Sequence, residues 1–573
     1  MFAAHSTRVN PPTPAIVSQQ AVRRLPRLAL LLFCAAYVLP GFIGRDPWKS
    51  ADMMTLGYVW ELAQGTTSWL QPTLLGMPPE FDALLPYWLG AWAVKLAPAW
   101  LHADFAARLP FVALLVLTLL GTWYGVYYLA RSPGAQPVSF AFGGEARPAD
   151  YARAMADGGL LALMACLGLA QLSHETTPAV AQLGFTALSF YGLAAMPYRG
   201  MLPAAMLLLG LAGLALSGAP TMALLFTLGG AAVSVMDHPR DAAGGGSRWR
   251  WAAVAVFGAL VVIALSTSMN LWRWRLDDPM GAGYHDWRGS ARLLLWFTWP
   301  AWPLAVWTLW RWRAQLTSRH VALPLWFVAV AIGTTLATPS SDRSLLLGLP
   351  AMATLAAFAL PTFKRSVAAL IDWFTLLFFS GCAIVIWVIW LSMQVGIPPK
   401  PAANIARLAP GFVPSFSLVA FLAALLGTLA WAWLVKWRAG RHRAAIWKSL
   451  VLPASGTALC WLLLMTLWLP VLDYARSYTP VVARIQQVMG SKPACVQVMG
   501  LNRGQLAALR FHGQLALEDA SAQSRCPWLV ATQQLSAVVA TLDPQRPWIL
   551  QATVRRPTDA RDNLVVYSRP ATR

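Results

Sequence analysis

The side chains best placed for chemistry are ionisable groups at the ends of long apolar stretches. Asp46 comes directly after the first such stretch and stands beside Arg45. A carboxylate can act as a general base toward a hydroxyl group, and a guanidinium group offers a forked donor that fits a phosphate. Ionisable residues at a membrane face are functional candidates by default, so this pair is a candidate site for acid–base chemistry and anion binding.

Other candidates occupy similar positions: Lys49, Asp82, Arg108, Glu175 and Arg343. Each also has a purely structural explanation. Asp46 could cap a helix with Pro47 at its first position, Glu175 could cap the helix before Pro178, and the arginines could be interfacial anchors. The motifs of soluble enzymes (GxxxxGK(S/T), HExxH, CxxC, GxSxG) are absent from the sequence, and its eight histidines show no metal-ligand spacing.

The composition indicates what kind of chain must position these residues. Of its 573 residues, 57% are hydrophobic and only 12% are charged, and the formal net charge is +21. Soluble domains carry about 25% charged residues, so the composition argues against a soluble enzyme and excludes a disordered chain. It predicts an all-α polytopic membrane protein, with the basic excess in short cytoplasmic loops rather than on a nucleic-acid partner.

About thirteen stretches are long and apolar enough to span a bilayer. They are 27–43, 105–130, 158–173, 179–196, 201–217, 219–236, 251–268, 291–310, 321–338, 344–361, 367–391, 413–435 and 450–471.

The basic residues predict the orientation of these spans. Lys and Arg are roughly twofold enriched in the N-terminal tail and in the loops on the same side, namely 131–157, 197–200, 237–250, 311–320, 362–366 and 436–449. This bias places the N-terminus inside. Thirteen spans then place the C-terminus outside, in the periplasm of a bacterial inner membrane.

Three parts of the chain are predicted: a cytoplasmic tail (1–26), a transmembrane domain (27–473) and a periplasmic α/β domain (474–573). The first outer loop, 44–104, holds two apolar patches, Met53–Leu62 and Leu84–Leu96, predicted as amphipathic helices on the bilayer surface.

In the tail, Cys495–Met499, Trp528–Thr532 and Leu564–Tyr567 are predicted strands, and Asn502–His512 a helix. Cys495 and Cys526 are the only cysteines there, so an oxidising periplasm predicts that they form a disulfide.

The first loop also shows an ordered series of motifs. These are Gly44-Arg45-Asp46-Pro47-Trp48, Trp60-Glu61-Leu62-Ala63-Gln64-Gly65, Trp69-Leu70-Gln71-Pro72, Asp82-Ala83-Leu84-Leu85-Pro86-Tyr87-Trp88 and Phe105-Ala106-Ala107-Arg108-Leu109-Pro110. The series resembles the polyprenyl-phosphate-sugar-dependent glycosyltransferases of the aminoarabinose transferase and protein O-mannosyltransferase family. Later pieces of the same pattern also fit: Trp299-Pro300 or Trp302-Pro303, and Arg343 followed by Leu349-Pro350-Ala351.

The resemblance implies a GT-C-like fold of about thirteen helices with a periplasmic C-terminal domain. It also implies transfer of a sugar from an undecaprenyl-phosphate carrier to a lipid acceptor, such as a lipopolysaccharide component, or to a protein. Asp46 and Glu175 would then be catalytic acids, and Arg45, Lys49, Asp82, Arg108 and Arg343 would bind the donor. No nucleic-acid partner is expected, and a divalent cation is neither required nor excluded.

The sequence departs from the family pattern at two positions where many members carry lysine. Ala83 follows Asp82 where the family has Asp-Lys-Pro-Pro, and Gly218-Ala219-Pro220 stands in place of Lys-Gly-Pro. Either an arginine or Lys49 replaces these cations, or the phosphate is held differently, or the protein is not a transferase. The alternatives are a non-catalytic flippase for lipid-linked sugars and a degenerate, silent relative of the transferases.

Overall fold

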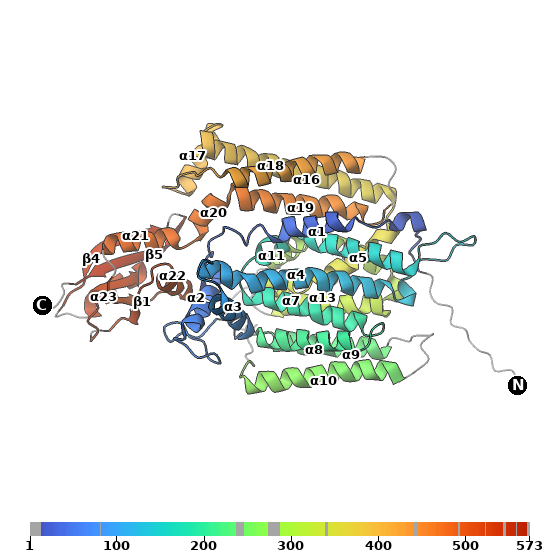
Figure 1. Ribbon diagram of the computed structural model, residues 1–573, viewed down its shortest axis with the longest axis horizontal. Helices are drawn as coiled ribbons and strands as arrows, with labels where there is room; N and C mark the ends of the chain where they lie inside the picture. The colour runs from blue at the N-terminus through green and yellow to red at the C-terminus, as the bar shows by residue number, and fades with distance from the viewer. Residues whose placement is uncertain are drawn as a thin grey trace.

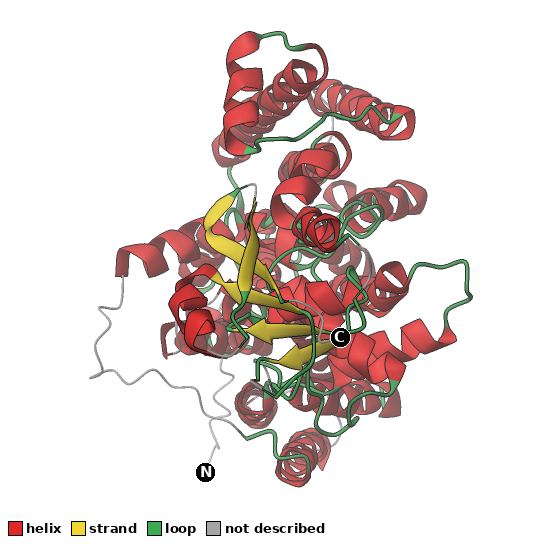
Figure 2. Ribbon diagram, turned by 90° about the vertical axis from the view of Figure 1, so that its left-hand side faces the viewer, coloured by secondary structure: helices red, strands yellow, loops and turns green. Residues whose placement is uncertain are grey.

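The computed structural model describes residues 13–80, 82–236, 246–272, 287–337, 342–439, 445–490, 493–521, 523–542, 546–556 and 558–569. Long helices lie side by side in one bundle, and a small sheet domain lies at one end of it (Figure 1). Viewed from that end, the yellow strands lie in front of the helices (Figure 2).

The helices of the bundle fall on the predicted apolar stretches, but three of these stretches (158–173, 291–310 and 344–361) each contain parts of two helices. They are α1 (Arg27–Val38), α4 (Ala103–Ala130), α5 (Pro148–Ala165), α6 (Leu167–Leu172), α7 (Pro178–Ala195), α8 (Met201–Leu216), α9 (Pro220–Met236), α10 (Gly246–Ser268), α11 (Trp287–Phe297), α12 (Ala301–Arg311), α13 (Arg319–Ala337), α14 (Asp342–Leu346), α15 (Leu349–Ala359), α16 (Arg365–Val395), α18 (Leu418–Ala439) and α19 (Lys448–Leu467).

Six helices in the described part of the chain are long and apolar enough to cross a membrane: α4, α10, α13, α16, α18 and α19. Four shorter apolar helices accompany them: α1, α8, α9 and the helix that starts at Leu349. These helices indicate a multi-pass membrane protein, while the count of thirteen spans stays a prediction. The predicted basic loops at 237–250 and 436–449 lie partly outside the described residues.

The centre of the bundle depends on close helix contacts. α4 packs against α7 through Gly121 and Gly184. A Cβ atom on Gly121 would come within 2.9 Å of the Ala187 carbonyl oxygen, and one on Gly184 within 3.1 Å of the Leu114 carbonyl oxygen. Small residues allow two apolar helices to approach this closely and gain van der Waals contact.

The C-terminal domain contains a five-stranded sheet in the order β2-β1-β3-β5-β4. The strands are β1 (Val496–Met499), β2 (Leu517–Asp519), β3 (Trp528–Thr532), β4 (Ile549–Arg556) and β5 (Asp559–Ser568). β1 is parallel to both β2 and β3, whereas β5 is antiparallel to β3 and β4. The helices of this part are α20 (Leu469–Arg476), α21 (Thr479–Met489), α22 (Arg503–Phe511) and α23 (Ser536–Leu542).

The predictions for this domain are confirmed for three strands, the helix between them and the disulfide. β1, β3, β5 and α22 lie where the sequence placed them, and Cys495 is bonded to Cys526. β2 and β4 were not predicted. β2 is only three residues long, and β4 is mostly exposed, so neither carries a strong apolar pattern.

Three further helices lie outside the main bundle: α2 (Ala51–Gln64), α3 (Leu85–Leu96) and α17 (Pro399–Leu408). The prediction of a surface-lying amphipathic helix is wrong for α2. Its residues are buried on every side from Ala51 to Val59, because α2 packs between α3 and α22 and shares one apolar core with the sheet domain. α3 keeps exposed apolar side chains at Trp92 and Leu96.

Candidate functional site

The candidate site lies where three segments meet at the sheet-domain end of the bundle (Figure 1). The first is the connection from α1 to α2 with residues 45–50. The second is the turn between α6 and α7 at residues 173–177, and the third is α20, directly after α19. Each segment follows or precedes an apolar helix, so their ionisable side chains collect at one level of the molecule.

The most deeply buried element of the site is an ion pair between Arg45 and Asp52. The Arg45 Nη2 atom lies 2.8 Å from Asp52 Oδ2, and the two side chains are only 1% and 2% exposed. Arg45 also donates to the Gly41 carbonyl at 2.7 Å and the His174 carbonyl at 2.8 Å.

Asp52 is satisfied on both carboxylate oxygens. It accepts hydrogen bonds from the Thr176 backbone N–H at 2.8 Å, from the Thr176 hydroxyl and from the Trp48 N–H at 3.2 Å. Burial works to raise the pKa of Asp52, but the charges of Arg45 and Arg108 and the Thr176 bonds outweigh it, and the pKa lies below its usual value. The pair is therefore a buried ion pair that holds the site in place.

Trp48 joins this support to α20. Its indole N–H donates to Asp473 Oδ1 at 2.7 Å. The guanidinium carbon of Arg45 lies 4.6 Å from a Trp48 ring centroid, and that of Arg476 lies 4.9 Å from one. Cation–π contact with two arginines fixes the indole ring. It also places the exposed guanidinium of Arg476 beside the buried pair.

Asp46 is half-buried and turns toward α20 and α21. Its Oδ2 accepts a hydrogen bond from the Thr479 hydroxyl at 2.8 Å, and its backbone N–H lies 3.3 Å from Asp473 Oδ1. The alternative that Asp46 caps the next helix is wrong, because α2 begins at Ala51 and Ser50 is its N-cap residue.

Asp473 is a second acid, and it lies next to Asp46. Burial, reinforced by the charge of Asp46, raises the pKa of Asp473 to about 7, against the lowering effect of the Trp48 hydrogen bond. A carboxyl group with a pKa near the ambient pH is suited to exchange protons with a substrate.

Glu175 lies on the turn between α6 and α7. Burial and the charge of Asp52 raise its pKa, while a hydrogen bond from Gln171 and the charges of Arg343 and Arg45 lower it, and the net shift is upward. Glu175 does not cap α7, because that helix begins at Pro178 with Thr177 as its N-cap residue. The structure thus brings Glu175, Arg343 and Arg45 into one electrostatic field.

Arg108, near the start of α4, has mainly a supporting position. Its guanidinium group donates to the Phe42 carbonyl at 3.1 Å and pairs with Asp104 at 3.0 Å. The side chain is 3% exposed, so it holds the connection after α1 against α4.

Two predicted donor-binding residues lie apart from these groups. Lys49 turns to the sheet domain, where its Nζ atom lies 2.6 Å from Asp559 and 3.4 Å from Asp562. Asp82 lies against Gly218: a Cβ atom on Gly218 would come within 3.0 Å of the Asp82 carbonyl oxygen and 3.5 Å of the Ala83 Cβ atom. The two positions that lack the family lysines, Ala83 and Gly218, are therefore neighbours in space.

Sequence reasoning missed Asp52, Asp473 and Arg476. Asp473 and Arg476 directly follow the last apolar stretch, so the criterion that selected Arg45 and Asp46 would have found them. Asp52 stands in an apolar run, and Thr176, which donates hydrogen bonds to it, is more than a hundred residues away in the sequence.

One group of described residues has the spacing of a metal site: Cys495, Glu518 and Cys526. Its two cysteines form the disulfide, so they offer no thiolate ligands.

The fold and this site define a class: a multi-pass helical membrane protein with a C-terminal sheet domain and an acid–arginine cluster between the two. Two solved structures share this fold over almost their whole length. They are the crystal structures of ArnT from Cupriavidus metallidurans in the apo state (TM-score 0.58, 16% identity) and bound to undecaprenyl phosphate (TM-score 0.56, 15% identity). Each comparison covers 95% of this chain and 98% of the ArnT chain. No family model and no curated protein matches the chain.

Proposed function

We propose that this protein is a membrane glycosyltransferase that moves a sugar from an undecaprenyl-phosphate carrier to an acceptor outside the inner membrane. The acceptor class is a lipopolysaccharide component, such as lipid A, or a protein. The ArnT fold supports the lipid carrier, since one ArnT structure is bound to undecaprenyl phosphate. The observation that carries the proposal is the cluster of Asp46, Asp473, Glu175 and Arg476 at the end of an apolar bundle, where a lipid-linked head group leaves the bilayer.

Asp46 is the proposed base. It accepts the proton of the acceptor hydroxyl while that oxygen forms a bond to the anomeric carbon of the sugar. The bond from the anomeric carbon to the phosphate oxygen breaks, its electron pair stays on the phosphate, and undecaprenyl phosphate leaves. Attack opposite to the leaving group inverts the anomeric centre. Asp473, whose pKa is about 7, lies next to Asp46. It can therefore receive the proton from Asp46 after the transfer.

The donor phosphate is assigned to Arg476 and Arg343. Arg45 is bound to Asp52, and Arg108 is bound to Asp104 and Phe42, so both are positioning residues in this proposal. Arg476 is exposed and held on the face of Trp48. Forked guanidinium groups suit phosphate oxygens, which compensates for the lysines missing at Ala83 and Gly218.

The proposed topology has the N-terminus in the cytoplasm and the sheet domain in the periplasm. It is supported by the excess of Lys and Arg in the loops predicted to be cytoplasmic.

Binding of undecaprenyl phosphate tests the donor assignment. Purified protein in detergent should show a higher midpoint of thermal unfolding when undecaprenyl phosphate is added. The Arg476→Ala variant should bind at least tenfold more weakly. Arg407→Ala is the matched control, because Arg407 is an exposed arginine on α17 that bonds only to Asn404 among the described residues. Absence of stabilisation in the wild type would refute the proposal.

Transfer is tested by the Asp46→Asn variant. The amide oxygen can still accept the Thr479 hydrogen bond, so folding should be unchanged, but the amide cannot take a proton. Cells with and without the protein are compared by mass spectrometry of lipid A, core oligosaccharide and membrane proteins. A sugar-sized mass increment that depends on the wild type should fall by a factor on the order of 10²–10⁴ with Asp46→Asn. An increment that persists at the wild-type level would favour a flippase.

A further inference from the structure

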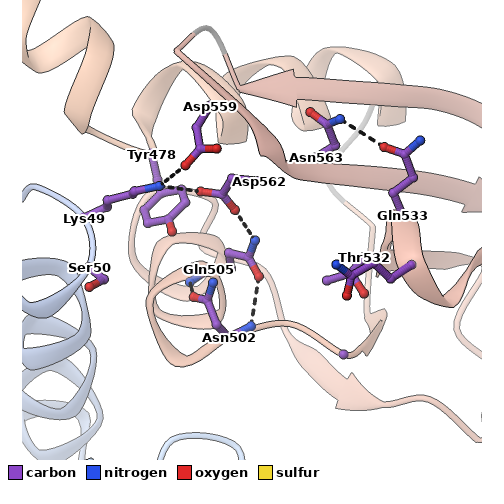
Figure 3. A pocket seen from close by; sticks show the side chains of 12 residues that line it. Lys49, Ser50, Tyr478, Asn502, Gln505, Thr532, Gln533, Asp559, Asp562 and Asn563 are labelled. Carbon is purple, nitrogen blue, oxygen red and sulfur yellow. Dashed lines mark hydrogen bonds and ion pairs between the residues drawn. The ribbon is translucent and has the colours of Figure 1, made fainter. Parts of the chain in front are cut away.

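The sheet domain contains a polar cavity that the proposed transfer reaction does not use. Its volume is about 640 Å³. It lies between the loops after β1 and β3, the start of β5, and the segment Lys49–Ser50 that leads into α2 (Figure 3). Its size falls within the range of small-molecule sites, roughly 300–1,000 Å³.

The cavity lies at the point where the strand order of the sheet reverses, between β1 and β3. The chain leaves β1 through α22 to β2 on one side of β1, and β3 then pairs with the other side of β1. The chain leaves β3 in the opposite direction, toward β4 and β5. The connections that follow β1 and β3 therefore diverge, and Gly500, Asn502 and Gln533 of these connections line the cavity with Thr532, the last residue of β3. In open α/β sheets, ligands bind at this kind of crevice.

The wall of the cavity is rich in groups that both donate and accept hydrogen bonds. Amides and hydroxyls predominate: Ser50, Tyr478, Asn502, Gln505, Thr532, Gln533, Gln534 and Asn563. Each amide offers a carbonyl oxygen and an NH₂ group, and each hydroxyl offers one donor and two acceptor sites. A ligand that carries several hydroxyl groups matches this inventory.

Bonds among the lining residues hold several of these amides in fixed positions. Asn502 and Gln505 form a capping box at the start of α22, with both N–H···O distances at 2.9 Å. Gln505 also donates to Asp562, and the Asn563 amide donates to Gln533 at 3.0 Å. Such preorganisation reduces the entropy that a ligand must pay on binding.

The charges in the cavity are paired with one another. Lys49 lies against Asp559 and Asp562, and Asp562 also receives a bond from Arg556 at 2.9 Å. A phosphorylated ligand would meet two carboxylates, and a cationic ligand would have to displace Lys49 or Arg556. The wall therefore favours a neutral ligand.

From these observations we propose that this cavity, which we call the switch-point pocket, binds an uncharged sugar ring. The pocket begins three residues after Asp46, at Lys49. The Lys49 backbone N–H donates to the Arg476 carbonyl at 2.9 Å, which links the pocket wall to the acid–arginine cluster. In this one respect the inference rests on the proposed function: the sugar would belong to the acceptor. Binding itself does not require transfer.

Saturation-transfer NMR on the full-length protein in lipid nanodiscs tests the proposal with a panel of D-glucose, D-galactose, D-mannose, N-acetyl-D-glucosamine and L-arabinose. At least one sugar should bind with a millimolar Kd. The variant Gln533→Ala with Gln534→Ala should weaken that binding at least fivefold. Both glutamines are exposed, so their replacement should leave folding intact.

Two control variants separate this pocket from the donor site. Gln551→Ala alters an exposed glutamine on β4 outside the pocket and should bind sugar as the wild type does, as should Asp46→Asn. The proposal is overturned if no sugar binds the wild type, if the paired glutamine variant binds equally well, or if Asp46→Asn abolishes binding. Failure of the undecaprenyl phosphate experiment would leave these results unaffected.

Discussion

Replacement of Asp52 by Asn should destabilise the site, because it removes the carboxylate of the buried Arg45–Asp52 ion pair. The Oδ1 atom of Asp52 accepts from Thr176, and an amide oxygen can continue to do so. The Oδ2 atom faces two donors, the Arg45 guanidinium at 2.8 Å and the Trp48 N–H at 3.2 Å. An NH₂ group at that position would point a donor at both of them.

The magnitude follows from the burial of the pair. Because the Arg45 side chain is only 1% exposed, water cannot replace the lost carboxylate, and Arg45 keeps only its two carbonyl acceptors. Removal of one partner from a buried pair costs about 3–5 kcal/mol. If that cost falls on the local stability of α2, its amides should exchange faster by a factor on the order of 10²–10⁴.

Hydrogen–deuterium exchange of residues 51–64, read by mass spectrometry, measures this directly. Asp104→Asn is the matched control, since it also removes the carboxylate partner of an arginine. Asp104 is 25% exposed and Arg108 keeps the Phe42 carbonyl, so the expected cost is about 1 kcal/mol or less. Acceleration below tenfold in Asp52→Asn, or equal acceleration in both variants, would refute the argument.

Three other outcomes are expected. The pKa of Asp473 is raised from 3.8 to about 7 in the folded protein, so the unfolded chain releases this proton at a lower pH. The free energy of unfolding therefore falls as the pH rises from about 4 to about 7. Asp473→Asn should therefore unfold at a higher temperature than the wild type at pH 8 and at the same temperature at pH 3, and equal midpoints at pH 8 would contradict this. Loss of the disulfide through Cys495→Ala with Cys526→Ala should cost roughly 3–4 kcal/mol in denaturant unfolding of the sheet domain, and an unchanged midpoint would show that the bridge adds nothing. A reporter that is active only in the periplasm, fused after Arg573, should be active, whereas activity of a cytoplasmic reporter alone would reverse the proposed topology.

The sequence predicted those parts of the fold that depend on local pattern. The apolar runs gave the helices of the bundle because a spanning helix is apolar along its whole length, and β1 and β3 stood out by their β-branched and apolar residues. The prediction for α2 is wrong because its Met, Leu, Tyr and Val side chains surround the helix axis and do not form one apolar face. A helix that is apolar all round is buried.

The candidate site was predictable only in part. Arg45, Asp46 and Glu175 were found because each stands at the end of an apolar run, and the structure places them near one another. The hydrogen-bond partners at the site were not predictable, because they are distant in the sequence. Asp52 accepts from Thr176, 124 residues away, and Asp46 accepts from Thr479, 433 residues away. No local spacing shows that Lys49 turns away from Arg45 toward Asp559.

The shared core of α2 and the sheet domain has a consequence for the synthesis of this protein. α2 ends at Gln64, but α22, which packs against it, does not begin until Arg503, so about 440 residues separate the two helices. At roughly 5–20 residues per second, the ribosome needs on the order of 20–90 s to synthesise the chain from α2 to α22. During that time the apolar surface of α2 has no native partner in the sheet domain. In a newly made chain the apolar surface of α2 must therefore be covered by the helices already synthesised or by a chaperone. This lasts until the last hundred residues of the chain have been synthesised.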